Sequence, residues 1–149
     1  MELDSNYYES MIIYQLYKFQ KNNREKMMKK YGLTDFYASF ILVIKLAKKE
    51  LCMADITKIL DIDKANTTRG IALLELRGYV VRNKKHDKER KYTISLTEKG
   101  EILANDILDC IRKSRDYVLS ILSDDEIREL KNIVKKIENN INSIEEQKC

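Results

Sequence analysis

The 149-residue chain contains no proline and only four glycines, so few positions in it would interrupt a helix. Its three cysteines are scattered and it has a single histidine, His86, which argues against a disulfide framework and against a metal site of the usual kind. The longest apolar stretch, Phe40 to Leu46, contains Lys45 and is too short to span a bilayer. The N-terminus lacks the basic and then apolar pattern of a signal peptide. These absences predict a helix-rich cytoplasmic protein with no metal, no cofactor and no membrane anchor.

Positive charge is concentrated in the middle of the chain. The net charge is +4, and residues 45–99 hold 14 lysines and arginines against 8 aspartates and glutamates. The rest of the chain holds 14 basic against 16 acidic residues, which is a negative balance. A local basic excess is typical of a surface that binds phosphates. On charge alone, an ordinary solvated surface explains the excess equally well.

Helical periodicity predicts two helices before residue 50. The first begins after Asp4 or Ser5, either of which can cap it, and runs to about Lys30. Its apolar positions recur at spacings of four, four and three: Tyr8, Ile12, Leu16 and Phe19. Gly32 ends this helix and Thr34 caps the next one. The inner face of the second helix is expected to consist of four residues: Phe36, Phe40, Ile44 and Ala47.

A helix-turn-helix is predicted in the central, basic part of the chain. A short helix over residues 54–60 leads to Asp63, which is a good N-cap for a helix from Lys64 to Arg77. Gly78 closes this second helix. Two short helices joined by a tight turn are the elements of a helix-turn-helix.

The apolar period changes from helical to alternating where that helix ends. Residues 79–82 and 92–96 are therefore predicted as strands, and the second strand places Tyr92, Ile94 and Leu96 on one face. A polar loop lies between the two strands. A hairpin that directly follows a helix-turn-helix is interpreted as a wing.

Two long helices are predicted after the hairpin. Thr97 caps the first, and a capping box of Ser123 and Glu126 begins the second. The last helix has a heptad pattern sustained over nearly three repeats: Ile127, Leu130, Val134, Ile137, Ile141 and Ile144. Such a helix is roughly 30 Å long and has little of the domain left to pack against, which favours dimerisation. The alternative is that the stripe packs on the preceding helix or on the first helix of the same chain.

Four short motifs occur in a characteristic order and spacing. They are GLT at 32–34, DIDK at 61–64 leading into Thr68-Arg69, LELRG at 74–78 and LTEKG at 96–100. Together they resemble the MarR family of regulators (multiple-antibiotic-resistance regulators) over nearly the whole chain. The chain departs from the family pattern at Lys88, where an aspartate usually stands two residues before the wing arginine, and at Gly70 and Leu73.

The resemblance implies a mainly α-helical fold with a small β wing, in which a winged helix-turn-helix is joined to long N- and C-terminal dimerisation helices. Residues 1–149 would form one such domain. Residues 32–100 would be the DNA-binding module, and residues 1–31 and 101–149 would be the dimerisation helices.

The resemblance also implies that the second helix of the helix-turn-helix enters the major groove of double-stranded DNA and that the wing reaches the adjacent minor groove. Asparagine can pair with adenine, arginine can pair with guanine, and the threonine methyl group can touch the methyl group of thymine. The candidate contacts in the helix are Lys64, Asn66, Thr67 and Arg69. The alternative is that Asn66 only begins the helix and that Thr68 faces inward.

Five residues of the wing complete the predicted DNA contacts. Arg90 is the candidate for the minor groove, where narrow A·T tracts concentrate negative potential. Asp87 is placed to orient its guanidinium through a charge-assisted hydrogen bond. Lys84, Lys85 and Lys88 are expected to contact phosphates. Without the preceding helix-turn-helix, the same residues would be interpreted as a solvated, charged hairpin.

Aromatic residues gather near the N-terminus, where six of the nine tyrosines and all three phenylalanines fall within the first 40 residues. Rings that carry hydroxyl groups can line an apolar pocket with a few polar groups. The resemblance implies a small aromatic or lipophilic effector, and the candidates for its pocket are Tyr14, Tyr17, Phe36 and Phe40. The alternative is that these rings fill the dimer core.

The predicted function is a homodimeric transcription regulator, in the family's usual mode a repressor, that binds a pseudo-palindromic operator and is released by the effector. An alternative of a different class is a dimeric winged-helix module that binds protein partners, with DNA binding lost or secondary. The central basic excess and the positions of Arg69 and Arg90 favour DNA. An enzyme fits less well, since the sequence has no nucleophile–base pair at a recognisable spacing, no phosphate loop and no glycine-rich turn.

Overall fold

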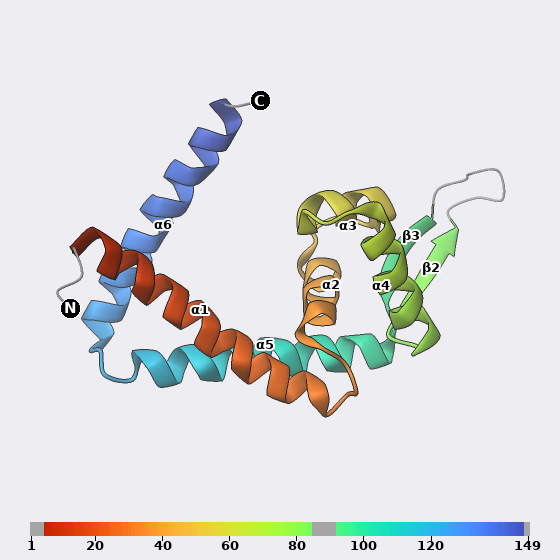
Figure 1. Cartoon of the computed structure of the whole chain (residues 1–149), viewed down its shortest axis with the longest axis horizontal. Helices are drawn as coiled ribbons and strands as arrows, with labels where there is room; N and C mark the ends of the chain where they lie inside the picture. The colour runs from red at the N-terminus through yellow and green to blue at the C-terminus, as the bar shows by residue number, and fades with distance from the viewer. Residues whose placement is uncertain (1–4, 85–91, 148–149) are drawn as a thin grey trace. The chain divides into compact units, whose positions relative to one another are not determined.

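The computed structural model describes residues 5–84 and 92–147, which are mainly helical (Figure 1). The helices are α1 (Ser5–Lys29), α2 (Asp35–Leu46), α3 (Met53–Leu60), α4 (Lys64–Leu76), α5 (Glu98–Leu119) and α6 (Asp124–Gln147). The strands are β1 (Leu51–Cys52), β2 (Val80–Lys84) and β3 (Tyr92–Leu96). The predicted winged helix-turn-helix fold is confirmed, and the predicted element ends lie within about two residues of the observed ones, as is usual for helix ends.

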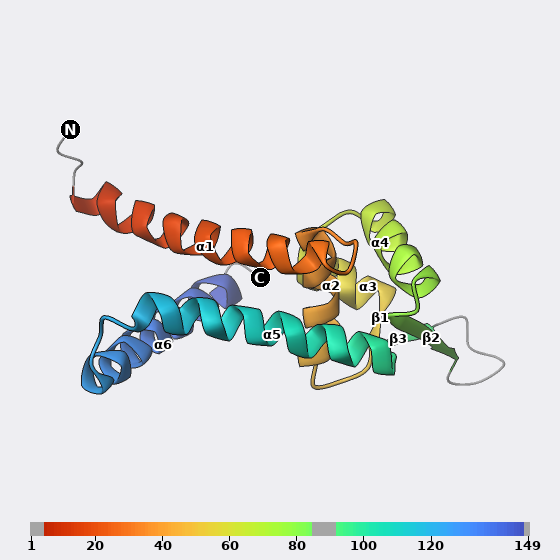
Figure 2. The same ribbon diagram turned by 90° about the horizontal axis from the view of Figure 1, so that it is seen from below.

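The chain separates into two compact units, Met1–Ser114 and Arg115–Cys149. Within the first unit, α2, α3 and α4 gather beside the small sheet in both views of the chain (Figure 1, Figure 2). None of the helices in residues 5–84 and 92–147 combines the length and the apolar character that a membrane span requires.

The sheet is antiparallel, with β3 in its centre between β1 and β2. The hairpin pairs Val80 with Leu96 and Lys84 with Tyr92. On the other edge of β3, Leu51 pairs with Ile94, which makes β1 the third strand. The sequence does not predict β1, because two residues are too few to show the alternation that identifies a strand.

The core of the first unit is made of large apolar side chains from five helices. The fully buried ones are Met28 of α1, Phe40 and Ile41 of α2, Ile56 of α3, Ile71 and Leu74 of α4, and Leu103 and Ile107 of α5. Their removal from water is the main stabilising contribution to this unit. Because every helix of the unit supplies at least one of them, the helix-turn-helix is supported from behind by α1, α2 and α5.

The ring of Phe40 lies directly against the backbone of α4 at Gly70. A Cβ atom built at Gly70 would lie 2.6 Å from Cζ of Phe40 and 3.0 Å from each Cε atom. The first distance is shorter than real Cβ contacts and the other two are very tight, so the ring occupies the space that a side chain at position 70 would need. The departure from the family pattern at Gly70 therefore has a packing cause.

The start of α5 is tied to the end of α4 through Thr97. Its hydroxyl donates to the carbonyl oxygen of Gly78 at 2.6 Å and accepts from the N–H of Gly100 at 3.1 Å. Thr97 is thus confirmed as the cap of this helix. A Cβ atom at Gly100 would lie 2.0 Å from the carbonyl oxygen of Tyr79, so the close approach of these two backbones requires glycine.

A forked ion pair joins α1 to α2. The Arg24 guanidinium donates from Nε to Oδ1 of Asp35 at 2.8 Å and from Nη2 to Oδ2 at 3.0 Å. The two side chains are only 15% and 11% exposed. The hydrogen bond to Asp35 raises the pKa of Arg24 above its ordinary value, so the charge on the guanidinium is secure. Two parallel hydrogen bonds fix the direction as well as the distance of the contact.

Two further contacts join α1 and the turn after it to α5. The side-chain amide of Asn23 donates to the Ser114 hydroxyl at 3.0 Å. The Tyr31 hydroxyl donates to the carboxylate of Asp106, and this hydrogen bond raises the pKa of Tyr31 to about 12. The end of α1 is therefore held by polar contacts to both α2 and α5.

The second unit contains the end of α5 and α6. The predicted capping box at its turn is confirmed, since the Ser123 hydroxyl accepts from the N–H of Glu126 at 3.3 Å and the Glu126 carboxylate accepts from the N–H of Ser123 at 2.8 Å. The apolar seam of α6 is exposed, with 37–55% of each side chain accessible: Leu130, Ile133, Val134, Ile137, Ile141 and Ile144.

We expect Gly70→Ala to destabilise the protein by about 1–3 kcal/mol, because the new methyl group and the Phe40 ring cannot occupy the same space. The helix propensity of alanine offsets part of this loss. Chemical denaturation followed by circular dichroism measures it. Combined with Phe40→Leu, which removes the obstructing ring, the double variant should lose less stability than the sum of the two single variants. Strictly additive losses would contradict the contact.

Candidate nucleic-acid interface

The turn between α3 and α4 is set by the backbone at Asp61. This residue ends α3 with a φ of 50°, in the left-handed region that aspartate enters more readily than most residues. The N–H of Ile62 then donates to the carbonyl oxygen of Thr57 at 3.4 Å. Asp63 follows at once as the N-cap of α4, so the chain turns between the two helices within three residues.

Two threonines connect the helices behind this turn. The Thr57 hydroxyl donates to the Thr67 hydroxyl at 2.9 Å, and Thr67 donates to the carbonyl oxygen of Asp63 at 3.1 Å. Thr67 is fully buried, on the same side of α4 as Ile71 and Leu74. Its inclusion among the predicted DNA contacts is therefore corrected, because its hydroxyl and methyl groups are used inside the module.

The face of α4 opposite the core carries one long cation among short side chains. Ala65, Arg69 and Ala72 recur at spacings of four and three and are all exposed. Thr68 lies beside Arg69 and is also exposed, so the inward-facing threonine is its neighbour in the sequence. Alanine side chains let a helix approach the edges of base pairs closely, while an arginine can reach beyond them. Lys64 is exposed at the first turn.

The polar side chains at the start of α4 are hydrogen-bonded to one another. Asp63 accepts the N–H of Asn66 at 2.8 Å through Oδ1, and its Oδ2 accepts the side-chain amide of the same residue. The Oδ1 atom of Asn66 in turn accepts from Nη2 of Arg69 at 2.8 Å. The hydrogen bond from the backbone N–H of Asn66 lowers the pKa of Asp63, so this carboxylate stays ionised.

A salt bridge between Arg82 and Glu75 joins the β2–β3 hairpin to α4. Nε of Arg82 lies 3.0 Å from Oε2 of Glu75, although the contact lacks the angle of a hydrogen bond. Across the hairpin, the amide of Asn83 donates to the Ser95 hydroxyl at 2.7 Å. These contacts hold the base of the wing beside the C-terminal half of α4.

The predicted wing residues are only partly within the described structure. Lys84 is exposed at the end of β2, with its Nζ 5.9 Å from the centre of the Tyr92 ring. The other four predicted contacts, Lys85, Asp87, Lys88 and Arg90, lie outside the described residues. Their roles stay predictions.

The four predicted pocket residues differ in exposure, since three are exposed and one is buried. Tyr14 and Tyr17 of α1 are 57% and 55% exposed, and Phe36 of α2 is 43% exposed. Phe40 is fully buried, with the Phe36 ring edge-on to it at 5.1 Å between centroids. The place of Phe40 in the predicted pocket is therefore corrected, because it is a core residue that packs on Gly70.

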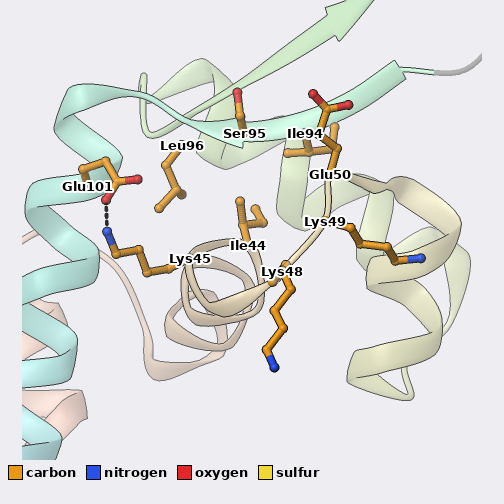
Figure 3. A pocket seen from close by; sticks show the side chains of 10 residues that line it. Ile44, Lys45, Lys48, Lys49, Glu50, Ile94, Ser95, Leu96 and Glu101 are labelled. Carbon is orange, nitrogen blue, oxygen red and sulfur yellow. Dashed lines mark hydrogen bonds and ion pairs between the residues drawn. The ribbon is translucent and has the colours of Figure 1, made fainter. Parts of the chain in front are cut away.

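A cleft of about 350 Å³ opens elsewhere on the module, between the end of α2, strand β3 and the start of α5 (Figure 3). Figure 3 shows Lys45 paired with Glu101 on one wall, while Lys48 and Lys49 point away from Leu96. None of the predicted pocket residues lines this cleft. Its lysines are also partly neutralised, so it is a polar surface depression with no cluster of aromatic rings. In the part of the chain that the structure describes, no group of three His, Cys, Asp or Glu is placed to hold a metal ion.

Three exposed residues around Arg69 are not among the DNA contacts predicted from the sequence. Ala65, Thr68 and Ala72 share its face of α4. Helical spacing is the signal that could have found Ala65 and Ala72, since they lie four residues before Arg69 and three residues after it. The contact of Arg82 with Glu75 was also missed, because no local pattern relates a strand residue to a residue of the preceding helix.

The chain is similar in sequence to proteins named as regulators of transcription. No family model matches the chain. The chain is 32% identical over 133 residues to the HTH-type transcriptional regulator BilQ of Clostridioides difficile (strain CD3), across 87% of this chain and 88% of that protein. It is 27% identical over 143 residues to the HTH-type transcriptional regulator SarZ of Staphylococcus epidermidis (strain ATCC 12228 / FDA PCI 1200), across 93% and 92% of the two chains.

Solved structures with the same fold cover nearly the whole chain. A MarR transcriptional regulator from Methanosarcina mazei Go1 is similar with a TM-score of 0.77 and 27% identity, over 95% of this chain and 94% of that one. The MarR protein from Peptoclostridium difficile DA00132 has a TM-score of 0.73 and 21% identity, over 95% and 91% of the two chains, which is a likeness of fold.

Proposed function

Because the chain belongs to the MarR family of winged-helix transcription regulators, we propose that it is a repressor that binds a pseudo-palindromic operator as a homodimer and is released from it by a small-molecule effector. The family supports DNA binding and regulation of transcription. Repression, the dimeric complex with the operator and the response to an effector are the finer parts of the proposal.

The observation that carries the proposal is the exposed face of α4. Arg69 stands between Ala65 and Ala72 on the side of this helix that faces away from the core. A helix of this shape fits the major groove, where the guanidinium can donate two hydrogen bonds to O6 and N7 of guanine. Lys64 and Thr68 border the same face and are exposed, so they would contact phosphates or base edges. Asn66 would either contact a base directly or act by holding the guanidinium of Arg69.

The wing adds the second set of proposed contacts. The pair of Arg82 and Glu75 holds the base of the hairpin beside α4, so a loop that extends beyond Lys84 would reach the groove next to the one that α4 enters. Lys84, Lys85 and Lys88 would contact phosphates. Arg90, oriented by Asp87, would enter the minor groove.

Exposed apolar faces in each unit support the homodimer. In α6 the seam that includes Ile137 and Ile141 is about half exposed, and in α1 the exposed fractions of Ile12, Ile13 and Tyr17 are 43%, 71% and 55%. Helices that present so many aliphatic side chains to water are typical of surfaces that associate. We assign dimerisation to residues 1–31 and 101–149 and DNA binding to residues 32–100.

The effector proposal depends on aromatic side chains that are exposed to solvent in a single chain. Tyr14, Tyr17 and Phe36 are each 43% exposed or more. A dimer would cover them, either as lining of a pocket for a small aromatic or lipophilic compound or as part of the interface itself.

We expect a selection from sheared DNA of the source organism to enrich one pseudo-palindromic site. On that site, Arg69→Ala and Arg90→Ala should each weaken binding by about 1–3 kcal/mol, because each removes a contact to a base or a groove. The matched controls, Arg112→Ala and Lys113→Ala, also remove one exposed positive charge and should leave the affinity nearly unchanged. Fluorescence anisotropy at fixed salt compares the four variants.

Equal losses in all four variants would reduce the interaction to general charge attraction. If the folded protein enriches no sequence at several salt concentrations, specific DNA binding is refuted. A winged-helix module that binds a protein partner would then be the better interpretation.

Ile137→Glu should convert a dimer into a monomer at micromolar concentration, because it places a charge in the centre of the α6 seam. Asn139→Glu adds the same charge on the opposite side of the helix and should leave the dimer intact. Sedimentation equilibrium distinguishes the two states. A wild-type chain that sediments as a monomer, or two variants that behave alike, would refute the proposed interface.

A thermal-shift screen with phenolic acids should find a compound that raises the melting temperature and lowers affinity for the selected site. Binding to the folded state alone stabilises it by about 2.7 kcal/mol at a ligand concentration of 100 times Kd. Tyr17→Ala should reduce the shift. A screen that finds no stabilisation at millimolar concentrations would argue against release by this class of effector.

A further inference from the structure

We propose that Asp63 and Asn66 are positioning residues for Arg69, so that the three side chains together read a single base pair. This inference rests on the proposed function, since it concerns how the DNA site is read. In this inference Arg69 alone contacts a base, whereas the sequence suggests two independent contacts, from Asn66 to adenine and from Arg69 to guanine.

The three residues are spaced for contact along the first turns of α4. Residues three apart on a helix are neighbours, so Asn66 lies between Asp63 and Arg69. The hydrogen bonds follow the same order, from Nη2 of Arg69 to Oδ1 of Asn66 and from the amide of Asn66 to Oδ2 of Asp63. Asp63 is also held by the backbone N–H of Asn66 at 2.8 Å, which anchors the set of contacts to the helix.

The chemistry of the end groups determines the orientation of the amide in the middle. An ionised carboxylate only accepts hydrogen bonds and a guanidinium only donates them. Asn66 must therefore turn its NH₂ group toward Asp63 and its oxygen toward Arg69, as observed. The reverse orientation would place donor against donor and acceptor against acceptor.

This orientation removes Asn66 as an independent reader of adenine. Bidentate pairing with adenine requires the oxygen and the NH₂ group of the asparagine side by side on the base edge. Here the two groups are directed to opposite neighbours along the helix, and Asn66 is less exposed than Arg69. Turning the amide toward a base would break both contacts.

The same contacts prepare Arg69 for its base. One N–H group of the guanidinium is used to hold it against Asn66, and the fork has further donors for O6 and N7 of guanine. A side chain that is held before binding loses less rotamer freedom on binding. The Asp63 carboxylate adds discrimination, because it attracts the guanidinium and repels phosphates that approach the start of α4 in another register.

The test is a binding selection from a randomised operator, with the preference at each base pair measured by sequencing for wild type and variants. The position that loses its preference in Arg69→Ala identifies the base pair that Arg69 reads. We expect Asn66→Ala to reduce the preference at that same position about 3- to 10-fold and to leave the other positions unchanged. Adding Asn66→Ala to Arg69→Ala should cause no further loss.

Asp63→Ser tests the first residue of the set without removing the helix cap, since serine is also a good N-cap. It should reduce the preference at the Arg69 position, with a melting temperature close to that of wild type. Leu76→Ala is the matched control, because it shortens an exposed side chain at the far end of the same helix that makes none of these contacts. It should keep the preference at the Arg69 position.

The outcomes separate this inference from the function on which it rests. If Asn66→Ala loses an adenine preference at another base pair, or leaves every preference unchanged, the positioning role is refuted while specific DNA binding stands. If Asp63→Ser leaves the preference at the Arg69 position unchanged, the role of Asp63 is refuted. If wild type enriches no sequence at all, the proposed function fails and the inference fails with it.

Discussion

The contact between the Phe40 ring and the backbone at Gly70 fixes how close α4 lies to α2. A larger residue at position 70 would push the two helices apart, and the buried face of α4 with Thr67, Ile71 and Leu74 would lose its packing. When this face of α4 packs on the core, the helical repeat turns the opposite face, which carries Arg69, away from it. The surface that α4 exposes, which we propose contacts DNA, is therefore determined by contacts on the far side of the same helix.

The position of α1 depends on polar contacts in addition to apolar packing. Arg24 and Asp35 form two parallel hydrogen bonds with little exposure, so a change in the angle between α1 and α2 must lengthen or break at least one of them. Apolar contacts tolerate sliding better, because dispersion has little directional preference. A pair of this kind makes the relation between α1 and α2 definite.

The sequence predicts elements well where the pattern is long or the cap is specific. The helices, the hairpin and the caps at Asp63, Thr97 and Ser123 follow from periodicity and from side chains that satisfy the first N–H groups of a helix. Strand β1 could not be predicted because it has only two residues and depends on an edge formed by β3.

Within the site, the exposed position of Arg69 could be predicted, but the division between Thr67 and Thr68 could not. Adjacent helix residues point about 100° apart, and either threonine satisfies the same local pattern. Which one is buried depends on where Thr57 and Phe40 lie, and these come from other helices. For the same reason, the sequence alone does not decide whether Phe40 lines a pocket or fills the core.

Few side chains on α4 can carry base information, and this limits how the helix can discriminate among sites. Ala65 and Ala72 offer only methyl groups, Thr67 is buried, and Asn66 is directed to its neighbours. An operator read mainly by one guanidinium in each half-site would be poorly specified by the helix alone. The remaining specificity would then come from Lys64 and Thr68 where they reach base edges, from the wing, from the shape of the DNA, or from the spacing of two half-sites that a dimer would impose. In a regulator built in this way, any change that alters the distance between the two recognition helices acts on specificity directly, without touching a residue that contacts a base.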